Sequence, residues 1–462
     1  MLTVAYLANQ FPCAVEPYVV EEIKELRGRG IQVIAGSVRT PRNTDARAIE
    51  DMPEVVVQSL HGMVLLRALL LCWRRWNRIS GLVSRVVFPG HEGLIQRIKA
   101  LIHTWLGACY AVMLENRGVE HIHVHHGYFG SWIAMVAAQL LDVGFSMTLH
   151  GSDLLLHGTY LDVKLERCTF CLTVSEYNRR YIVEHYPSAK AEKIVVSRLG
   201  VALADRVHDE RPRTAKDCGD FTILAVGRLH AVKDHAFLVR ACAELRERGV
   251  RFDCSIAGDG PEHRNLELLI RKCGLDGKIT LLGHVSREQM PSLYDRADVV
   301  VLTSRSEGIP LVLMEAMARG KIVLAPAITG IPELVVAGKT GYLYEPGSLD
   351  DLVYRLHFIH SLIRASDGPS VHPYIGSAVR QLDWVRHAAR LQIRHNFNRT
   401  RNLKLFSDLF IQRVTPQMAS PFHENSVLQQ VQLSLQRHGS LPVRANGTDA
   451  VAGSRGSPVF DV

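Results

Sequence analysis

The sequence lacks a hydrophobic run long enough to cross a membrane. Its most apolar stretch, residues 63–73 (MVLLRALLLCW), has about half of the ~20 residues that a spanning helix needs, and it contains Arg67. The first residues, MLTVAYLANQFP, show no basic segment followed by a long apolar one, unlike a secretory signal peptide. We therefore expect a cytoplasmic protein that at most lies on the inner face of the membrane.

The sequence also lacks a paired cysteine framework. Its nine cysteines are odd in number and scattered, mostly within apolar stretches. Cys168 and Cys171 form one C-x-x-C, but no second pair follows, which argues against a structural zinc site. We interpret the cysteines as reduced core thiols.

The length of the chain indicates how many domains it forms, and its charge indicates the class of its partner. A chain of 462 residues with 47% hydrophobic residues is long enough for two cores. The formal net charge of +8 favours an anionic partner, which could be nucleic acid, anionic lipid or a phosphorylated substrate. No aromatic-rich RNA-binding motif is present, so we do not expect a nucleic-acid partner.

Short β-rich runs alternate with helical patterns along both halves of the chain. LTVAYLA, PYVVEEIKELRGRG and IQVIAGSV begin the first series, and FTILAVGRL, HAFLVRACAELRERG and RFDCSIAGDG begin the second. Such alternation predicts an α/β fold with two Rossmann-like, doubly wound domains. The predicted parts are a first domain at residues 1–198, a linker at 199–219, a second domain at 220–385, a helix returning to the first domain at 386–413, and a disordered tail at 414–462.

The chemistry is concentrated in SRSEGIPLVLMEAMARG, residues 304–320. Glu307 follows a predicted strand, and Glu315 falls inside the next helix. The backbone of Gly308, Ile309 and Pro310 lies where a helix begins, and such a place can bind an anion. A phosphate could dock there while the carboxylates accept hydrogen bonds from sugar hydroxyl groups.

A second pair of candidates, Arg228 and Lys233, stands in VGRLHAVKDH directly after a predicted strand. With the two glutamates and the later segment TGIPELVVAGKTGYLYEPG, they resemble glycosyltransferase family 4 over nearly the whole chain up to about residue 413. That resemblance implies the GT-B fold and a retaining hexosyltransferase. It also implies that Arg228 and Lys233 bind the donor diphosphate, that Glu307 contacts the donor sugar and that Glu315 binds the ribose.

Two segments of the first domain indicate a subgroup of this family. HIHVHH (residues 121–126) and SMTLHGSDLL (residues 146–155) are similar to segments of exopolysaccharide and colanic-acid type members. The likeness places His150 at a strand tip facing the cleft, against the donor sugar or its phosphate, with Asp153 on the acceptor side. Glu16 is a further acceptor-side candidate. His121, His123 and His125 alternate along one strand, which suits either a metal site or, more simply, a buried hydrogen-bonded set.

The resemblance implies a nucleotide-diphosphate sugar as donor and no metal or other cofactor, because two cations can replace a magnesium ion. The acceptor is expected to be a saccharide carried on polyprenyl diphosphate, in surface or exopolysaccharide synthesis. Two alternatives remain open, namely a nucleotide-sugar 2-epimerase on the same fold and a non-catalytic scaffold that binds polyanions.

Residues 63–87 combine a leucine-rich face with five arginines and two tryptophans. That composition suits an amphipathic helix lying on a membrane, and equally an ordinary helix packed on the first domain.

Overall fold

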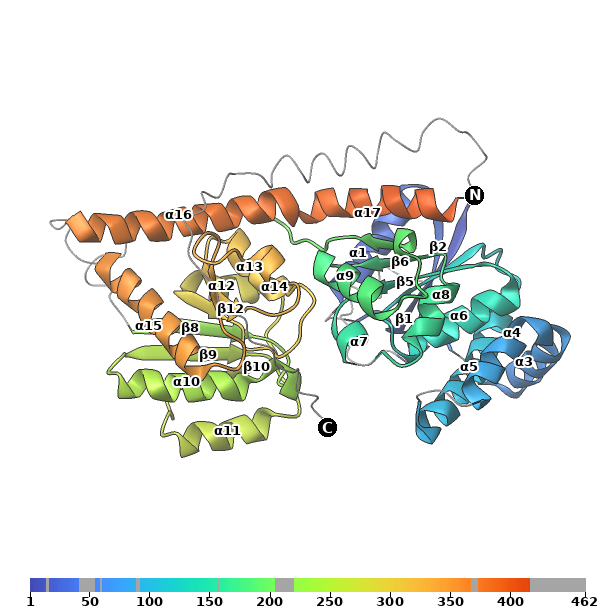
Figure 1. The fold of residues 1–462 in the computed structure, drawn as a ribbon, viewed down its shortest axis with the longest axis horizontal. Coiled ribbons are helices and arrows are strands. Elements are labelled where there is room, and N and C mark those ends of the chain that lie inside the picture. The colour runs from blue at the N-terminus through green and yellow to red at the C-terminus, as the bar shows by residue number, and fades with distance from the viewer. Residues whose placement is uncertain are drawn as a thin grey trace, which may run out of the picture. The chain divides into compact units, whose positions relative to one another are not determined.

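The computed structural model describes residues 1–13, 16–40, 55–58, 60–88, 92–156, 158–203, 220–366 and 373–415. Residues Met1–Thr415 form one compact unit. This unit contains two parallel β-sheets, each with its own hydrophobic cores, as the alternating pattern predicts (Figure 1). All but the first two residues of the predicted tail, and most of the predicted linker, lie outside the described residues.

The first sheet has seven parallel strands in the order β3-β2-β1-β4-β5-β6-β7. Its central strands are almost wholly buried because helices cover both faces, which explains their continuous apolar runs. The strands are β1 (Thr3–Gln10), β2 (Gln32–Arg39), β3 (Val55–Val57), β4 (His121–His125), β5 (Gly144–Leu149), β6 (Phe170–Thr173) and β7 (Ile194–Val196).

Helices α5 and α6 form the largest helical contact of the first domain. Helix α6 is buried almost all round, as expected from its run of alanine, valine and leucine. Residues 62–87 form two helices rather than one, with the break at Arg75. The helices of this domain are α1 (Pro17–Gly28), α3 (Gly62–Arg74), α4 (Trp76–Val87), α5 (Leu94–Leu114), α6 (Phe129–Leu141), α7 (Ser152–Leu155), α8 (Leu161–Arg167), α9 (Glu176–His185) and the 3-10 turn η1 (Ala191–Lys193).

The second sheet has six parallel strands in the order β10-β9-β8-β11-β12-β13. This is the doubly wound order, in which a ligand crevice forms at the carboxyl ends of the strands where the winding reverses, here between β8 and β11. The strands are β8 (Phe221–Val226), β9 (Phe252–Ala257), β10 (Ile279–Gly283), β11 (Val299–Val301), β12 (Ile322–Pro326) and β13 (Tyr342–Tyr344).

Helices of the second domain cover this sheet. They are η2 (Ala231–Lys233), α10 (His235–Glu247), α11 (His263–Lys272), α12 (Met290–Arg296), α13 (Leu311–Ala318), α14 (Ile331–Leu334) and α15 (Leu349–Ser366). The long helix α16 (Pro373–Asn396) packs against α13 and α15, and α17 (Arg399–Val414) packs against α1 of the first domain (Figure 1). The predicted returning helix is therefore two helices that meet near residue 397, and the first of them begins before the predicted boundary at 385.

Two aromatic rings fix α17 to the first domain. Phe406 and Phe410 of α17 are buried in the core that contains β1 and α1. Asn398 caps α17 by accepting a hydrogen bond from the backbone N–H of Arg401 at 3.1 Å. Within the described residues, no helix is both long enough and apolar enough to span a membrane.

Candidate functional site

Lys233 and Glu307 meet at the carboxyl edge of the second sheet. Lys233 ends the turn after β8, Glu307 lies in the loop after β11, and these two strands are neighbours. The ammonium group of Lys233 donates to a carboxylate oxygen of Glu307 at 2.5 Å. Both side chains are largely shielded from solvent, at 21% and 11% exposed, so the pair is only weakly screened. The structure thus brings together two of the residues that the sequence singled out.

Arg228 lies in the same loop as Lys233 and is exposed. In the part of the chain that the structure describes, its guanidinium group forms no ion pair with a carboxylate. Its charge nevertheless reaches Glu16, where it is one of the influences that lower the pKa of that carboxyl group. Arg228 is therefore a cation near the first domain that is available to an anionic ligand.

Gly308 sits where the loop after β11 approaches the first domain. A Cβ atom at this position would lie 1.8 Å from the carbonyl oxygen of His150, so a larger residue forces the two loops apart. A Cβ at Gly330 would lie 2.6 Å from the carbonyl oxygen of Gly308. The GIPELV segment and the HGSD segment, far apart in sequence, therefore both touch the loop that carries Glu307.

The remaining donor-side candidates surround the start of α13. Pro310 is the residue before the helix rather than a residue of its first turn, and Ile309 is buried beside it. Glu315 lies one further turn along, and its carboxylate accepts a hydrogen bond from the hydroxyl of Tyr294 at 2.7 Å. The structure holds Glu315 in place through Tyr294, and Glu315 forms no hydrogen bond or ion pair with Lys233.

His150 follows β5, and its imidazole is engaged by the protein. Its Nε2 lies 3.0 Å from Nδ1 of His125. The ring of Tyr18 packs over it with the two ring centres 4.8 Å apart. Burial, together with the charges of His126 and His125, lowers the pKa of His150 well below its usual value. His150 is therefore neutral at physiological pH and suited to hydrogen bonding.

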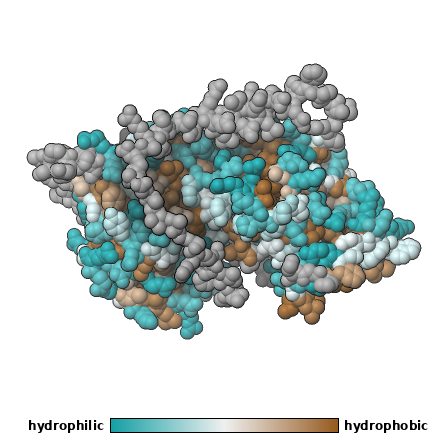
Figure 2. All heavy atoms as spheres, in the orientation of Figure 1, coloured by the Kyte–Doolittle hydropathy of each residue, from teal (hydrophilic) through white to brown (hydrophobic). Residues whose placement is uncertain are grey.

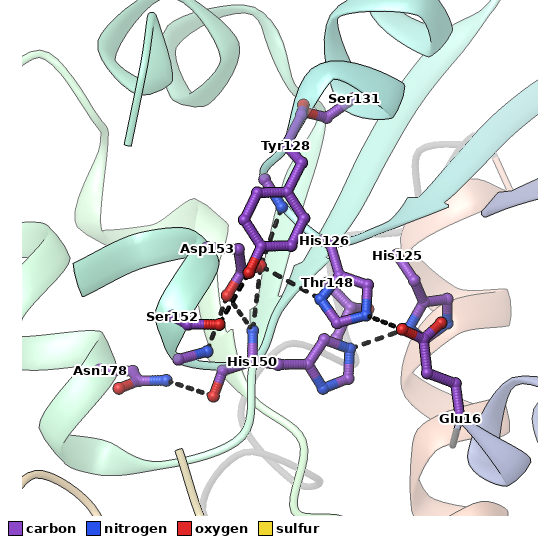
Figure 3. Close-up of polar contacts among 12 residues, drawn as sticks. Glu16, His125, His126, Tyr128, Ser131, Thr148, His150, Ser152, Asp153 and Asn178 are labelled. Atoms are coloured by element: carbon purple, nitrogen blue, oxygen red, sulfur yellow. Dashed lines mark hydrogen bonds and ion pairs between the residues drawn. The ribbon is translucent and has the colours of Figure 1, made fainter. Parts of the chain in front are cut away.

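His126 occupies the centre of an ion-pair cluster in the first domain (Figure 3). Its Nε2 lies 3.0 Å from Glu16, and its Nδ1 lies 3.7 Å from the fully buried Asp153. Burial alone would lower the pKa of His126, but the two carboxylates outweigh it and raise the pKa to about 10. His126 is thus a largely shielded cation at neutral pH, held between two anions.

Asp153 shapes the loops around this cluster. Its carboxylate accepts hydrogen bonds from the backbone N–H groups of Gly127 at 2.8 Å, Gly151 at 2.7 Å and His150 at 3.1 Å (Figure 3). Burial would raise its pKa, but the hydrogen bond and the charge of His126, together with the backbone N–H of Gly151, lower it. Asp153 therefore fixes the backbone on both sides of the site, and its expected acceptor contact stays a prediction.

The strand histidines form the buried hydrogen-bonded set that was the simpler interpretation. His121 and His123 share Ser146, each with a ring nitrogen 2.7 Å from the hydroxyl oxygen. Of the described residues, Glu22, His123 and His125 have ligand atoms within 4.8 Å of one another and could surround a metal ion. Their ring nitrogens and carboxylate are already hydrogen-bonded to one another or to neighbouring hydroxyls, so the network is satisfied without one.

Sequence reasoning missed several residues that matter here. His126 was seen only as part of HIHVHH, yet its φ of 70° marks the turn that aims it at Glu16 and Asp153. Glu333, in the GIPELV segment, accepts hydrogen bonds from the backbone N–H groups of Glu176 and Tyr177 at the start of α9, at 3.0 and 2.7 Å. The sequence contains one indication of this role. Ser175 caps the start of α9, and the unpaired backbone N–H groups at a helix start favour a carboxylate such as that of Glu333.

Comparison with known proteins assigns the second domain. Residues 207–361 match the family described as glycosyl transferases group 1. The chain contains a glycosyl transferases group 1 domain. WcaL of Salmonella typhimurium, named for colanic acid biosynthesis, is 38% identical over 172 residues, which cover 36% of this chain and 41% of WcaL. AmsK of Erwinia amylovora, an amylovoran biosynthesis glycosyltransferase, is 32% identical over 175 residues, covering 35% and 40%.

The chain thus spans less than half the length of these curated relatives, and the conserved fold is seen more fully in solved structures. HepE of Anabaena, solved in complex with UDP, superposes with a TM-score of 0.62 at 16% identity, over 89% of this chain and all of HepE. The predicted GT-B fold and the predicted family resemblance are both confirmed.

Proposed function

We propose that this protein is a retaining glycosyltransferase that moves a hexosyl group from a nucleotide-diphosphate sugar to a saccharide acceptor in exopolysaccharide synthesis. The observation that carries the proposal is the Lys233–Glu307 pair at the crevice of the group 1 domain, with Arg228 exposed in the same loop. The names of WcaL and AmsK support the pathway, and the UDP bound by HepE supports the donor class.

The charges match the needs of the reaction. Breaking the bond between the anomeric carbon and the diphosphate oxygen leaves negative charge on the diphosphate. Arg228 and Lys233 are placed to stabilise that charge, and a preorganised cation in a shielded site is worth more than one in water. Glu307 orients Lys233 and retains a second carboxylate oxygen for a sugar hydroxyl group.

The acceptor hydroxyl attacks the anomeric carbon from the same face of the sugar ring as the one from which the diphosphate leaves. The acceptor hydroxyl forms the new bond to the anomeric carbon, and its proton passes to the diphosphate oxygen that leaves. No cofactor enters this scheme, and we expect activity without added metal because the two cations take the place of a metal ion. The neutral His150 borders Gly308 and can donate a hydrogen bond to the donor sugar or its phosphate.

The acceptor is proposed to be carried on polyprenyl diphosphate at the inner face of the cytoplasmic membrane. Helices α3 and α5 expose many large apolar side chains. Figure 2 shows hydrophobic residues exposed at the free end of α5, as well as at other places on this face. Examples are Met63 at 69%, Trp73 at 78%, Leu94 at 74% and Ile95 at 70% exposed. Exposed apolar patches of this kind mark contact surfaces, and arginines are close by in sequence.

Transfer is tested with a donor panel and a lipid-linked acceptor extract, comparing wild-type protein with Glu307→Gln. Loss of at least 100-fold in turnover with an unchanged unfolding temperature supports the assignment. Turnover within threefold of wild type in Glu307→Gln contradicts it, and conversion of the donor into its epimer without release of nucleotide diphosphate identifies an epimerase instead.

A further inference from the structure

A pocket of about 370 Å³ opens in the first domain, apart from the Lys233–Glu307 pair. It lies between α5, the start of α6 and the segment that leads into α8. Among the described residues that line it, none carries a carboxylate, whereas two are lysines and several are aromatic. The lining consists of Gln96, Lys99, Ala100, His103, Gly127, Tyr128, Phe129, Trp132, Thr159, Tyr160 and Lys164.

Lys164 places a buried amino group in this pocket. Its side chain belongs to a residue only 2% exposed, and its ammonium group donates to the carbonyl oxygen of Gly127 at 2.6 Å. Burial lowers the pKa of Lys164 to about 7, against a smaller opposing influence from Asp153 and Asp162. A buried ammonium group whose neighbouring contacts are carbonyl oxygens is stabilised when an anion enters beside it.

The charges of two further cations, Lys99 and Arg39, act on His103, which lines the pocket. Burial and the charges of Lys164, Lys99 and Arg39 lower the pKa of His103 to about 4. The guanidinium group of Arg39 lies 4.8 Å from the ring centre of Phe129, on which His103 also stacks with the ring centres 5.2 Å apart. The pocket therefore has aromatic walls within a positive electrostatic environment, which suits a ligand that is anionic at one end and apolar at the other.

Helix α5 connects this pocket to an exposed apolar surface. Gln96, Lys99 and His103 line the pocket at helical spacing. The adjacent stripe of the same helix consists of Ile95, Ile98 and Ile102, which are 70%, 49% and 52% exposed. An apolar chain leaving the pocket would therefore meet an apolar stripe one residue away around the helix.

The pocket also borders the candidate site. The hydroxyl of Tyr128, a lining residue, forms a hydrogen bond with Ser152 at 2.7 Å (Figure 3). Gly127, another lining residue, donates its backbone N–H to Asp153. His126 precedes both along the chain, so a ligand anchored in the pocket lies next to the ion-pair cluster around His126.

We propose that this pocket binds the diphosphate of a prenyl-linked acceptor, with the prenyl chain lying on the apolar stripe of α5. Lys99 and Lys164 contact the diphosphate, and the aromatic walls contact the first prenyl units. This inference rests on the proposed function, since it names the anchoring site of that acceptor. It adds a charge-recognition site in the first domain that is separate from the donor cations.

Farnesyl diphosphate is the probe, titrated calorimetrically into the full-length protein without donor. Lys99→Glu reverses a charge at the mouth of the pocket, and Lys272→Glu makes the same change on exposed α11 of the second domain. We expect Lys99→Glu to weaken binding at least tenfold and Lys272→Glu to leave it within twofold of wild type. Equal binding by the Lys99→Glu variant and wild type, or no binding to wild type, overturns the proposal.

Three further comparisons locate the ligand. Ile98→Asp should weaken the binding of farnesyl diphosphate at least fivefold, whereas Leu268→Asp, at a similarly exposed position on α11, should not. Inorganic pyrophosphate should bind at least tenfold more weakly than farnesyl diphosphate, and equal affinity overturns the role of the stripe. Lys233→Ala should not alter farnesyl diphosphate binding, and a tenfold loss in that variant places the ligand in the donor site and overturns the proposal.

UDP, GDP, ADP and dTDP binding by the same variants separates this inference from the proposed function. If one nucleotide binds to every pocket variant as to wild type while farnesyl diphosphate does not bind, only the pocket proposal fails. If none of the nucleotides binds to folded wild-type protein, the proposed function fails instead.

Discussion

His126 is predicted to be a pH-dependent source of stability for the first domain. Replacing it with glutamine in His126→Gln removes the cation that lies between Glu16 and the fully buried Asp153. Glutamine retains a hydrogen-bond donor of similar size, so the main loss is the charge. Asp153 would then be a buried carboxylate without its counter-ion.

The magnitude follows from the pKa. In the folded protein the pKa of His126 is raised from 6.5 to about 10. At about 1.4 kcal/mol for each unit of pKa, this favours the charged folded state by about 5 kcal/mol. Removing one partner of a buried ion pair costs about 3–5 kcal/mol in other proteins, so the two arguments agree. We expect His126→Gln to lower the free energy of unfolding by about 3–5 kcal/mol at pH 6.

The direction in which this contribution to stability changes with pH follows from the raised pKa of His126. Because the folded-state pKa of His126 is raised, its contribution is fully present below pH 6.5 and is lost as the pH rises through about 10. The difference between wild type and His126→Gln should therefore shrink steadily across this interval. Changes from Lys164, whose pKa is lowered to about 7, occur in both proteins and cancel in the difference.

Urea unfolding followed by tryptophan fluorescence measures this difference. Four of the five tryptophans lie in the first domain, and Trp384→Phe in both proteins removes the signal of the second. His185→Gln, on the exposed surface of α9, is the matched control and should track wild type at every pH. A difference of less than about 1 kcal/mol at pH 6, or one that is equal at pH 6 and pH 10, would refute the reasoning.

Three further outcomes are expected. Lys233→Ala should reduce transfer at least 100-fold while circular dichroism and the unfolding temperature stay unchanged; transfer within tenfold of wild type would exclude its role on the diphosphate. Gly308→Ala should lower both turnover and nucleotide affinity at least tenfold, because its Cβ would lie 1.8 Å from the carbonyl oxygen of His150 and displace the donor-side loop; turnover and affinity within threefold of wild type would contradict this. Glu333→Gln should destabilise the protein by about 1–2 kcal/mol in urea unfolding through the start of α9, and no loss would show that these N–H groups find other acceptors.

Local pattern predicted the fold well. Alternating strands and helices indicated both sheets, and the residues after β8 and β11 had to lie together because neighbouring parallel strands end at one edge. The ion pair between Lys233 and Glu307, 74 positions apart, was not predicted, because the order of the strands in the sheet had to be known first. Their roles towards a donor sugar come from the family resemblance and remain predictions.

The acceptor side was less accessible to sequence reasoning. Glu16 and His126 are separated by 110 positions, and which histidine of HIHVHH faces the acids depends on the turn at the end of β4. The single amphipathic helix considered for residues 63–87 proved to be two helices, and the apolar stripe of α5 beside them was missed. A pocket assembled from three segments has no sequence pattern of its own, because its chemistry depends on the packing of α5 against α6.

The most direct test of the account is donor hydrolysis by purified protein in the presence of EDTA. A panel of UDP-, GDP-, ADP- and dTDP-sugars is supplied to wild type and to Glu307→Ala, and release of free nucleotide diphosphate is followed. The account predicts that sugars of one nucleotide series are bound and slowly hydrolysed without metal, and that Glu307→Ala abolishes the hydrolysis. Folded wild-type protein that binds none of the panel would contradict it.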